Sequence, residues 1–370
     1  MSELPPTLAA MALTWSAALA WRLQRHHLTG AGAESIEAVV ERLVAVPSWS
    51  GDARTAIRLR LAESADRDVD AAVRQGRIFS TYSFRGAGNL MTPESASIHL
   101  ALRSAGRQWE LPSWRDYYNL QPEDWPALRA RVREVLRDGA LTQHELGVAV
   151  TQDPAYRHLL SAFTDKSHTF LKPFGWQGDL CFSPGDGATF RAMEAIPGWT
   201  GVAELDDAGP RAVRAYLAAY GPATVDRIQY WLGECLSAGR KRITGWLAGL
   251  GDAVVELEVE GETALCLAEH VDEIHRSEST DEVVLLPGSD QWILGAGTKD
   301  EHIVPPEHRA LATRGANVVL AGGRLCGVWK LQKDTVTVDW LTDGRAPAGP
   351  RTSAAVQRLS AAMGRDLQLA

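Results

Sequence analysis

The sequence has only four cysteines, Cys181, Cys235, Cys266 and Cys326, and they are scattered, with no CxxC pair. Their spacing speaks against a disulfide framework or a thiolate zinc site and is typical of a protein from a reducing cytoplasm. The ten histidines show no HExxH or other ligand spacing, so we expect no metal and no cofactor. The apolar stretch near the N-terminus follows Glu3, lacks a basic segment and is too short to span a bilayer. We therefore expect a cytoplasmic protein that does not enter a membrane.

Positive charge is also scarce, with 38 lysines and arginines against 46 acidic residues and a net charge of −8. General affinity for nucleic acid comes from basic side chains that neutralise phosphates, so this balance speaks against a non-specific polyanion binder. Residues 71–115 are an exception, because six arginines stand there against Glu94 and Glu110. That stretch predicts either one basic face on an acidic protein or a solvated surface with scattered arginines.

A pattern of helix, turn, helix and strand occurs three times in the 370 residues, a length that fits several modules. In the first occurrence, Thr14 and Ser35 are expected to cap two helices. A third helix begins after Asp52, and a strand follows Gly76. In the second occurrence, Thr142 and Glu145 form a capping box, the typical start of a helix.

The remainder of the chain is assigned by the same periodicities. Residues 166–187 are expected to form a strand–turn–strand with residues 175–178 at its tip. The third occurrence ends in a hairpin around Gly261-Glu262. The tail from Glu282 to Trp340 alternates apolar and polar residues and is expected to be mostly β, with a final helix over 352–364.

Three helices followed by a hairpin is the plan of a winged helix, a helix-turn-helix variant whose second helix can enter the major groove of DNA. The same plan also serves as a protein-interaction or scaffold module. We predict an α+β fold with winged-helix units at 1–120, 121–200 and 201–275 and a β-rich domain at 276–370.

Several stretches resemble a known family, the winged-helix DNA-binding family that contains the AlkZ and YcaQ DNA glycosylases. They are LTWSAALAWRLQRHHL (13–28), RGAGNL (85–90), FLKPFGWQGDLCFSPG (170–185), RAVRAYLAAYGPATVDRIQYWLG (211–233), VVLLPGSDQWILG (283–295), VPPEHRA (304–310) and GGRLCGVWKL (322–331). The resemblance covers almost the whole chain in the expected order. It implies a C-shaped array of three winged helices with a C-terminal β-rich domain, enclosing double-stranded DNA, and we expect a monomer. Characterised members excise alkylated bases, including interstrand crosslinks and bulky adducts from self-made genotoxins.

The catalytic motif of that family, Gln-x-Gln or Gln-x-Asp, is expected after the second helix of the first unit. Aligned by the flanking apolar residues, it falls on Pro47-Ser48-Trp49, so neither glutamine is present. Asn89 stands where a histidine is common in the family. The resemblance therefore keeps the scaffold motifs and departs at the chemistry.

Hydrolysis of an N-glycosidic bond needs a water aimed at the sugar carbon, and an alkylated purine leaves easily because it already carries positive charge. A side-chain amide can orient that water, whereas proline cannot and a tryptophan offers one donor. Ser48 could hold a water, and Asp52 could do so if it faced the cleft; alternatively, Asp52 caps the helix that follows it. Trp49 is expected either to stack on a base or planar ligand, or to be a core aromatic between helices.

Further candidate DNA-binding residues are less specific. Arg85 lies beside two glycines that permit close backbone approach to a phosphate, although a tight turn explains them equally well. The others are Asn89, then Lys172, Trp176 and Gln177 on the hairpin where the resemblance places a DNA-probing element, and Arg240, Lys241 and Arg242 ahead of a helix. An ordinary exposed hairpin and a solvated turn are the alternatives for the last two groups.

Three functions remain open from the sequence. The first is a DNA-binding protein that removes alkylated bases, with Ser48 and Asp52 handling the water and no cofactor. The second is a non-catalytic homologue that binds DNA lesions or sequesters a planar small molecule, which the exchange of glutamines for Trp49 favours. The third is a cleft repurposed for another small-molecule reaction.

Overall fold

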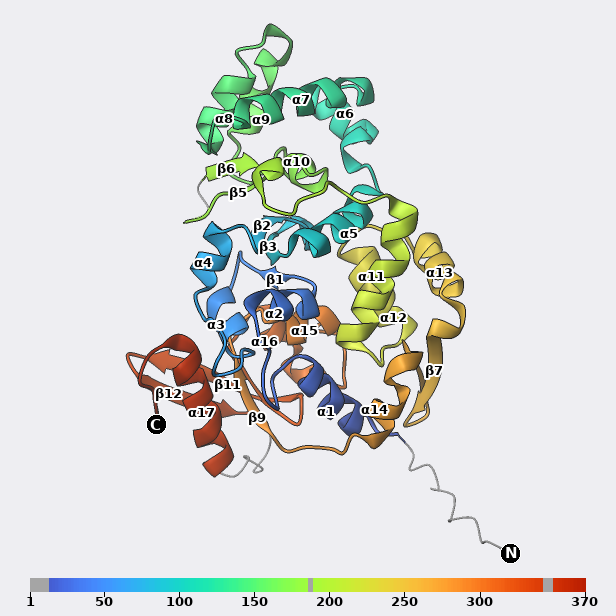
Figure 1. Cartoon of the computed structure of the whole chain (residues 1–370), viewed down its shortest axis with the longest axis vertical. Coiled ribbons are helices and arrows are strands. Elements are labelled where there is room, and N and C mark those ends of the chain that lie inside the picture. The colour runs from blue at the N-terminus through green and yellow to red at the C-terminus, as the bar shows by residue number, and fades with distance from the viewer. Residues whose placement is uncertain (1–12, 186–188, 342–348) are drawn as a thin grey trace, which may run out of the picture.

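Small sheets of mostly antiparallel strands, accompanied by helices, follow one another along the chain in the computed structural model (Figure 1). The structure describes residues 13–185, 189–341 and 349–370. The predicted α+β class is confirmed. The second unit stands at one end of the molecule and the C-terminal sheet at the other, with the first and third units between them (Figure 1). Among these residues, no helix is both long and apolar enough to cross a membrane.

The first unit contains α1 (Trp15–Arg25), α2 (Ile36–Leu43), β1 (Val46–Pro47), α3 (Ala53–Arg58), α4 (Val69–Arg74), β2 (Phe79–Tyr82) and β3 (Gly88–Met91). Its three strands pair in the order β1-β3-β2. Helices α5 (Pro93–Ser104) and α6 (Pro112–Tyr118) lead to the second unit.

The second unit contains α7 (Trp125–Leu136), β4 (Leu141–Thr142), α8 (Gln143–Val150), α9 (Leu160–Phe163), α10 (Lys172–Trp176), β5 (Leu180–Phe182) and β6 (Thr189–Ala192). Its strands pair in the order β4-β6-β5. The third unit contains α11 (Leu205–Tyr220), α12 (Val225–Ile228), α13 (Arg240–Gly249), β7 (Val254–Val259) and β8 (Glu262–Leu267), and Ala223 forms an isolated bridge with Leu265 of β8.

These three units share one topology. In each, a helix leads to a short extended segment, further α-helices follow (two in the first and third units, three in the second), and a hairpin closes the unit. In each, the short segment pairs with the second strand of that hairpin and not with the first. The repeat in the first unit begins at α2, because α1 lies outside this pattern and packs Leu19 and Leu23 into the core of the C-terminal region.

The C-terminal region contains α14 (Val271–Arg276), β9 (Val283–Leu286), α15 (Gln291–Ala296), α16 (Arg309–Thr313), β10 (Val318–Ala321), β11 (Arg324–Gln332), β12 (Thr335–Trp340), α17 (Gly349–Met363) and β13 (Gln368–Leu369). Its strands form one sheet in the order β13-β12-β11-β10-β9. The prediction of a mostly β tail is confirmed for the sheet, but α15 and α16 interrupt it between β9 and β10.

The predicted helix starts are confirmed by their capping contacts. The hydroxyls of Thr14 and Ser35 accept hydrogen bonds from the backbone N–H groups of Ala17 and Ala38. Thr142 and Glu145 form the predicted capping box. These caps satisfy backbone donors that the first helical turn leaves unpaired.

The predicted strand–turn–strand over 166–187 is wrong in its first half. Lys172–Trp176 is the short helix α10, which starts with Pro173 in its first turn. Gly175 of this helix packs on β2, where a Cβ atom would lie 3.1 Å from the Thr81 Oγ1 atom. Contact with the first unit therefore fixes this segment, and the hairpin begins only at Leu180.

Candidate functional site

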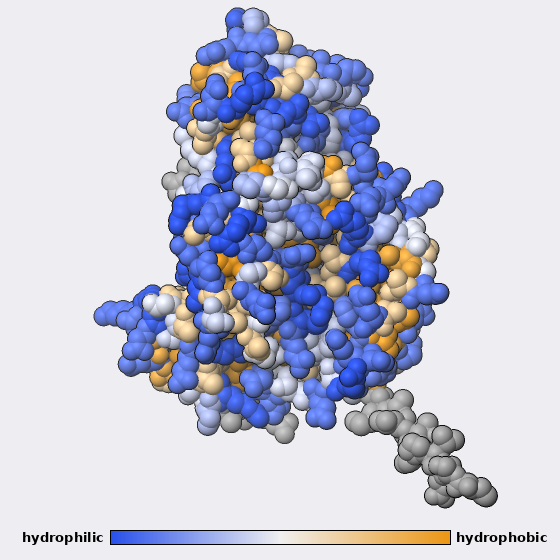
Figure 2. Space-filling model, in the orientation of Figure 1, coloured by the Kyte–Doolittle hydropathy of each residue, from blue (hydrophilic) through white to orange (hydrophobic). Residues whose placement is uncertain are grey.

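A groove of about 1250 Å³ runs between the first and second units. The first unit supplies residues 48, 49 and 51–54, part of α4 and residues of β2, β3 and the turn between them. The second unit supplies residues near α10 and β5. On the face in Figure 2, strongly hydrophilic residues gather over α4, which forms one wall. The groove is large enough for a ligand well beyond the size of one water or ion.

The groove lining carries more positive than negative charge, although the chain as a whole is acidic. Its basic residues are Arg54, Arg74, Arg85, Lys166 and Lys172, and its described acidic residues are Asp52 and Asp70. Asp70 is already paired with Arg54, at 2.6 Å. The local excess of cations favours an anionic ligand in this groove.

Ser48 stands where β1 ends and faces the groove. The backbone N–H of Ser48 donates to the carbonyl oxygen of Gly88 at 3.0 Å, which extends the pairing of β1 with β3 by one residue. The Ser48 hydroxyl lies 2.7 Å from the hydroxyl of Ser80 on β2. The exposed Ser48 hydroxyl and the half-buried Ser80 hydroxyl thus meet beside Gly88, which has no side chain to fill that space.

The chain reaches Ser48 through an unusual backbone turn at Val44, which ends α2 with φ 71° and ψ −44°. A β-branched residue rarely adopts positive φ, so this conformation is strained. The Ser95 hydroxyl donates to the Val44 carbonyl oxygen at 2.6 Å, and the Val44 side chain is buried. The turn is thereby held in place and directs the following residues across the sheet edge.

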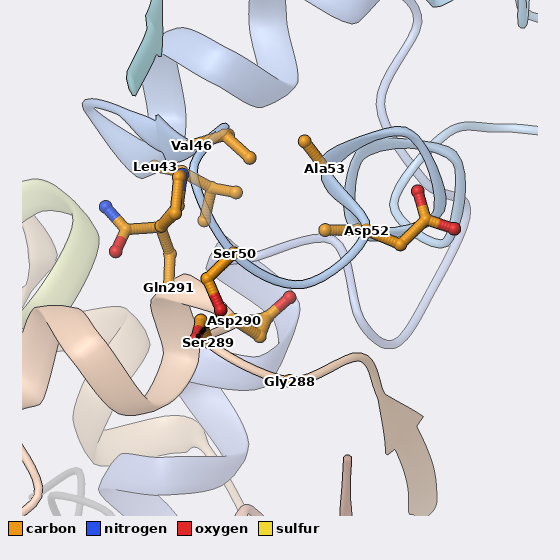
Figure 3. Close-up of a pocket in the computed structure, with 11 residues that line it drawn as sticks. Leu43, Val46, Ser50, Asp52, Ala53, Gly288, Ser289, Asp290 and Gln291 are labelled. Carbon is orange, nitrogen blue, oxygen red and sulfur yellow. Dashed lines mark hydrogen bonds between the residues drawn. The ribbon is translucent and has the colours of Figure 1, made fainter. Parts of the chain in front are cut away.

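Residues 50–52 rest on the C-terminal region around a small cavity (Figure 3). The Ser289 hydroxyl donates to the Ser50 hydroxyl at 3.1 Å. The backbone of Gly51 approaches Gly288 so closely that a Cβ atom at position 51 would lie 1.9 Å from the Gly288 carbonyl oxygen. Gly51 also has φ 74°, which glycine adopts at little cost. The close contact explains the glycine in this position.

A buried ion pair anchors the same contact. Arg60, which follows α3, donates to both carboxylate oxygens of Asp290 at 2.9 and 2.7 Å, and both side chains are fully buried. The Asp290 carboxylate also caps α15 by accepting from the backbone N–H of Trp292. A buried charge needs a close partner of opposite charge, so the first unit and the C-terminal region are tied together here.

Asp52 is the N-cap of α3, which was the alternative to a role in holding the water. One carboxylate oxygen accepts from the Thr55 backbone N–H at 3.0 Å, and the other accepts from the Thr55 hydroxyl at 2.5 Å. Figure 3 shows the Asp52 side chain turned away from Ser50 and Asp290. Both oxygens therefore have a structural contact, although the residue also lines the groove.

Trp49 is 56% exposed and lines the groove, so its interpretation as a core aromatic is wrong. Large aromatic side chains are usually buried, since burying them stabilises the fold. An exposed indole in a groove is suited to stack on a planar group, because every nucleobase offers a flat face.

Where the two units meet in the groove, a neutral aromatic pair stands near the Lys172 cation. The Tyr82 hydroxyl and the His168 Nδ1 atom are 2.6 Å apart. Burial raises the pKa of Tyr82, and burial together with Lys172 lowers the pKa of His168, so both are neutral near pH 7 and the tyrosine donates to the ring nitrogen. Burial and nearby Arg103 lower the pKa of the Lys172 ammonium.

Arg85 lines the groove and is held there by the third unit. Its backbone N–H donates to the Cys235 carbonyl oxygen at 2.8 Å, and its guanidinium hydrogen-bonds the Tyr230 hydroxyl and lies over the Tyr230 ring. The backbone at Arg85 has φ 54°, a left-handed conformation. The side chain remains exposed, so it can still contact an anion.

Comparison with known proteins agrees with this architecture. Residues 40–365 match the family model described as "DNA glycosylase AlkZ-like". An "Interstrand DNA cross-link repair glycosylase" from Streptomyces sahachiroi is 32% identical over 338 residues, which cover 89% of this chain and 91% of the relative. The chain belongs to the AlkZ-like DNA glycosylase family. The solved structure of Streptomyces sahachiroi DNA glycosylase AlkZ superposes with a TM-score of 0.90 at 30% identity, covering 97% of this chain and all of that one.

Within this AlkZ-like scaffold, two of the candidate DNA-binding residues are buried and their assignment is wrong. Asn89 is 3% exposed, and its amide donates to the Ser83 hydroxyl and the Ala87 carbonyl oxygen. Trp176 is 2% exposed, and the Arg103 guanidinium covers its ring at 3.7 Å. Both side chains stabilise the turn and helix that border the groove and leave no surface for DNA.

Other candidates lie apart from the groove of this AlkZ-like protein. The Gln177 amide donates to the Pro173 carbonyl oxygen, and this residue is absent from the groove lining. Arg240, Lys241 and Arg242 form the exposed first turn of α13 and do not stand ahead of the helix. Figure 1 places α13 at the margin opposite α4. Their role as phosphate contacts stays a prediction, and the structure does not bring them to Ser48.

The arginine-rich stretch 71–115 does not form one basic face. Arg74 and Arg85 reach the groove, whereas Arg103 is buried and Arg77 pairs with Glu37 and Asp66. The two remaining arginines, Arg107 and Arg115, pair with Glu110 and Asp116. The basic character of the groove depends instead on cations gathered from separate segments, including Arg54 and Lys166.

Sequence reasoning missed Ser80 and Tyr82 as groove residues of this family member. One local signal was present, because alternation along a strand places residues 80 and 82 on one face. Their approach to Ser48 could not be foreseen, since β1 and β2 are neighbours only through β3.

Proposed function

We propose that this chain binds double-stranded DNA that contains an alkylated base and hydrolyses the bond between that base and its sugar. The observation that carries the proposal is the groove of a DNA glycosylase family member in which an exposed indole, a hydroxyl-lined sheet edge and an excess of cations face the same space. The relatives named above are a DNA glycosylase and a glycosylase of interstrand crosslink repair, which makes the same class of substrate reasonable here.

Binding would combine two physical contributions. Arg74, Arg85 and Lys172 would neutralise phosphates, and Trp49 would stack on the damaged base once it leaves the helix. The shared topology of the three units supports their assignment as winged helices at 1–120, 121–200 and 201–275, with residues 276–370 as the fourth module. We infer that they surround the duplex in a C-shaped arrangement.

Hydrolysis makes modest demands when the base already carries positive charge. The departing purine needs no acid, so the protein must orient a water toward the sugar carbon and keep the base in place. The Ser48 hydroxyl is exposed in the groove and is suited to that water. We assign Asp52 first to its capping role, because both carboxylate oxygens contact Thr55.

The test is incubation of the full chain with a duplex that contains one 7-alkylguanine, followed by measurement of abasic sites. We expect abasic sites with the wild-type chain and a strong reduction with Ser48→Ala. Ser353→Ala, an exposed serine on α17 outside the groove lining, is the matched control and should retain full excision. Absence of excision from every alkylated duplex tested would overturn the hydrolytic part of the proposal.

A second candidate function is non-catalytic retention of the lesion or of a planar compound. One observation favours it: Pro47 has no side-chain donor, while Trp49, two residues later, presents a large exposed face. Titration of tryptophan fluorescence with damaged duplex and with a free planar alkylating compound separates the two candidate functions. The variant Trp49→Phe shows which part of the fluorescence change comes from Trp49. Salt-insensitive binding of the free compound without DNA binding would support sequestration, because phosphate contacts depend strongly on salt.

A further inference from the structure

We propose that the hydroxyls of Ser48 and Ser80 act together as the water-orienting group, above a hollow that Gly88 leaves in the sheet. This inference rests on the proposed base excision and names the residues that would perform it. It assigns a role to Ser80, which no sequence motif indicates, and it gives Asp52 no part in the chemistry.

The sheet register brings the relevant residues to one face. On β3, Gly88 stands opposite Tyr82 of β2, and Ser80 lies two residues from Tyr82 along the same strand. On the other side of β3, the Ser48 N–H donates to the Gly88 carbonyl oxygen. Since side chains alternate across a strand, Ser80 and Tyr82 share a face, and the 2.7 Å contact places the Ser48 hydroxyl beside Ser80.

Gly88 leaves space beside the serine pair that any other residue would fill. A Cβ atom at position 88 would lie 3.1 Å from the Ser48 Oγ atom, 3.5 Å from the Ser80 Oγ atom and 3.4 Å from the Phe182 ring. Any side chain there would occupy the space directly over the serine pair. The φ of Gly88 is not positive, so backbone freedom does not explain the glycine and the space itself does.

The pair offers what one side-chain amide offers. When one serine donates its hydrogen to the other, the second keeps its own hydrogen for an outside acceptor, and the first keeps lone pairs for an outside donor. A water above Gly88 could therefore donate to one hydroxyl and accept from the other. That is the combined donor and acceptor character that glutamine would supply, here produced by two residues from different strands.

The reaction balances without a strong base. The water oxygen forms a bond to the C1′ carbon of the sugar while the C1′–N9 bond breaks. The electron pair of the broken C1′–N9 bond moves to N9 and neutralises the positive alkylpurine. The added water then loses its proton to bulk solvent along the hydroxyl pair. A serine hydroxyl is a weak base, but a proton released after bond formation needs only a hydrogen-bonded path. Trp49, next to Ser48 in the chain, would hold the departing base beside this point.

The experiment measures single-turnover excision of 7-alkylguanine from duplex DNA, together with the Kd for the same duplex, for the full chain and its variants. We expect Ser80→Ala to lower the excision rate about 100-fold, the loss typical of one positioned hydrogen-bond donor, and to leave the Kd within about twofold. Ser80→Thr keeps the hydroxyl and should restore most of the rate. The double variant Ser48→Ala/Ser80→Ala should excise at a rate within a few-fold of either single variant. When two residues act as a unit, removing the second one costs little once the first is gone.

Gly88→Ala provides an independent test, because it keeps both hydroxyls and fills the space above them. We expect it to reduce excision at unchanged thermal stability, whereas Gly245→Ala, at a glycine of α13 with nothing within 4 Å of its Cβ position, should not. Wild-type excision with full activity in Ser80→Ala or Gly88→Ala would overturn this inference and leave the proposed function standing. Damaged-DNA binding without wild-type excision would overturn the hydrolytic function and the water site together.

Discussion

The first and second units differ in how their short first strand is joined to the helix that follows it. In the second unit, β4 ends at Thr142, and Thr142 itself caps the helix that follows. The third unit is equally direct, because Ala223 forms the bridge and Thr224 is the next N-cap. In the first unit, β1 ends at Pro47 and the N-cap is Asp52, so residues 48–51 are inserted between strand and cap.

This difference indicates what the insert is for. A direct connection suffices to build the unit, since two units are built that way. The insert instead presents Ser48 and Trp49 to the groove and rests Gly51 on the C-terminal region. Its support comes from outside its own unit, through the Ser50–Ser289 contact and the Arg60–Asp290 ion pair. Because Ser48 and Trp49 face the groove, they can change without loss of the scaffold, whereas Gly51 is fixed by its contact with Gly288.

The largest expected effect comes from breaking that outside support. Arg60→Met leaves the Asp290 carboxylate buried without its partner, and we expect the free energy of unfolding to fall by about 3–5 kcal/mol. Urea unfolding measures it. Arg54→Met removes the exposed Arg54–Asp70 pair and is the matched control, with an expected loss below about 1 kcal/mol. Equal losses in the two variants would show that the insert does not depend on this buried anchor.

The next effect concerns the exposed indole that only the first unit carries into the groove. Trp49→Ala should weaken binding of damaged duplex by about 1–3 kcal/mol, the value of one stacked base, with little change in stability. Fluorescence anisotropy with labelled duplex measures it. Tyr117→Ala removes an aromatic side chain that is 78% exposed on α6 and absent from the groove lining, and it should leave the affinity unchanged. An unchanged affinity in Trp49→Ala would refute stacking.

A smaller effect separates capping from chemistry at Asp52. Asp52→Ala and Thr142→Ala remove the caps of α3 and α8, and each should lower stability by about 1 kcal/mol. Asp52→Asn keeps the cap, because asparagine is as good an N-cap as aspartate. We expect this variant to retain both stability and excision. A tenfold loss of excision at full stability would place the Asp52 carboxylate in the reaction.

The smallest effect tests the charge of the groove. Lys172→Ala should reduce the slope of log K against log salt concentration by about 1, as the loss of one phosphate contact does. Arg240→Ala changes a residue of α13, which Figure 1 shows at the margin opposite α4, and it should leave the slope unchanged. Equal reductions in both variants would mean that duplex DNA extends to α13.

Local signals in the sequence predicted local structure well. Thr14, Ser35, Asp52 and Thr142 all cap the helices assigned to them, because a cap depends on residues only two or three positions away. The helix at Lys172 was missed for the opposite reason. Its conformation is set by packing of Gly175 on Thr81 and Tyr82, which lie about ninety residues earlier in the chain.

The same limit applied to the site. The position of the insert could be predicted from the resemblance, and the role of Ser48 in it stays a prediction. The sequence left open whether Trp49 is exposed or buried, and the structure exposes it. Asn89 and Trp176 have side chains suited to DNA contact, yet both are buried. Ser80 carries no signal in its own neighbourhood, because its partner Ser48 arrives across β3. Burial and cross-strand contact are properties of the folded chain and not of a short stretch of residues.

Release of 7-alkylguanine from duplex DNA, measured in parallel with binding of the same duplex, tests most directly whether the insert of the first unit is an active site. We expect the wild-type chain to bind the duplex and leave abasic sites, and Ser48→Ala to bind equally well while releasing little base. Release by Ser48→Ala at the wild-type rate, or tight binding by the wild-type chain without any release, would contradict this assignment.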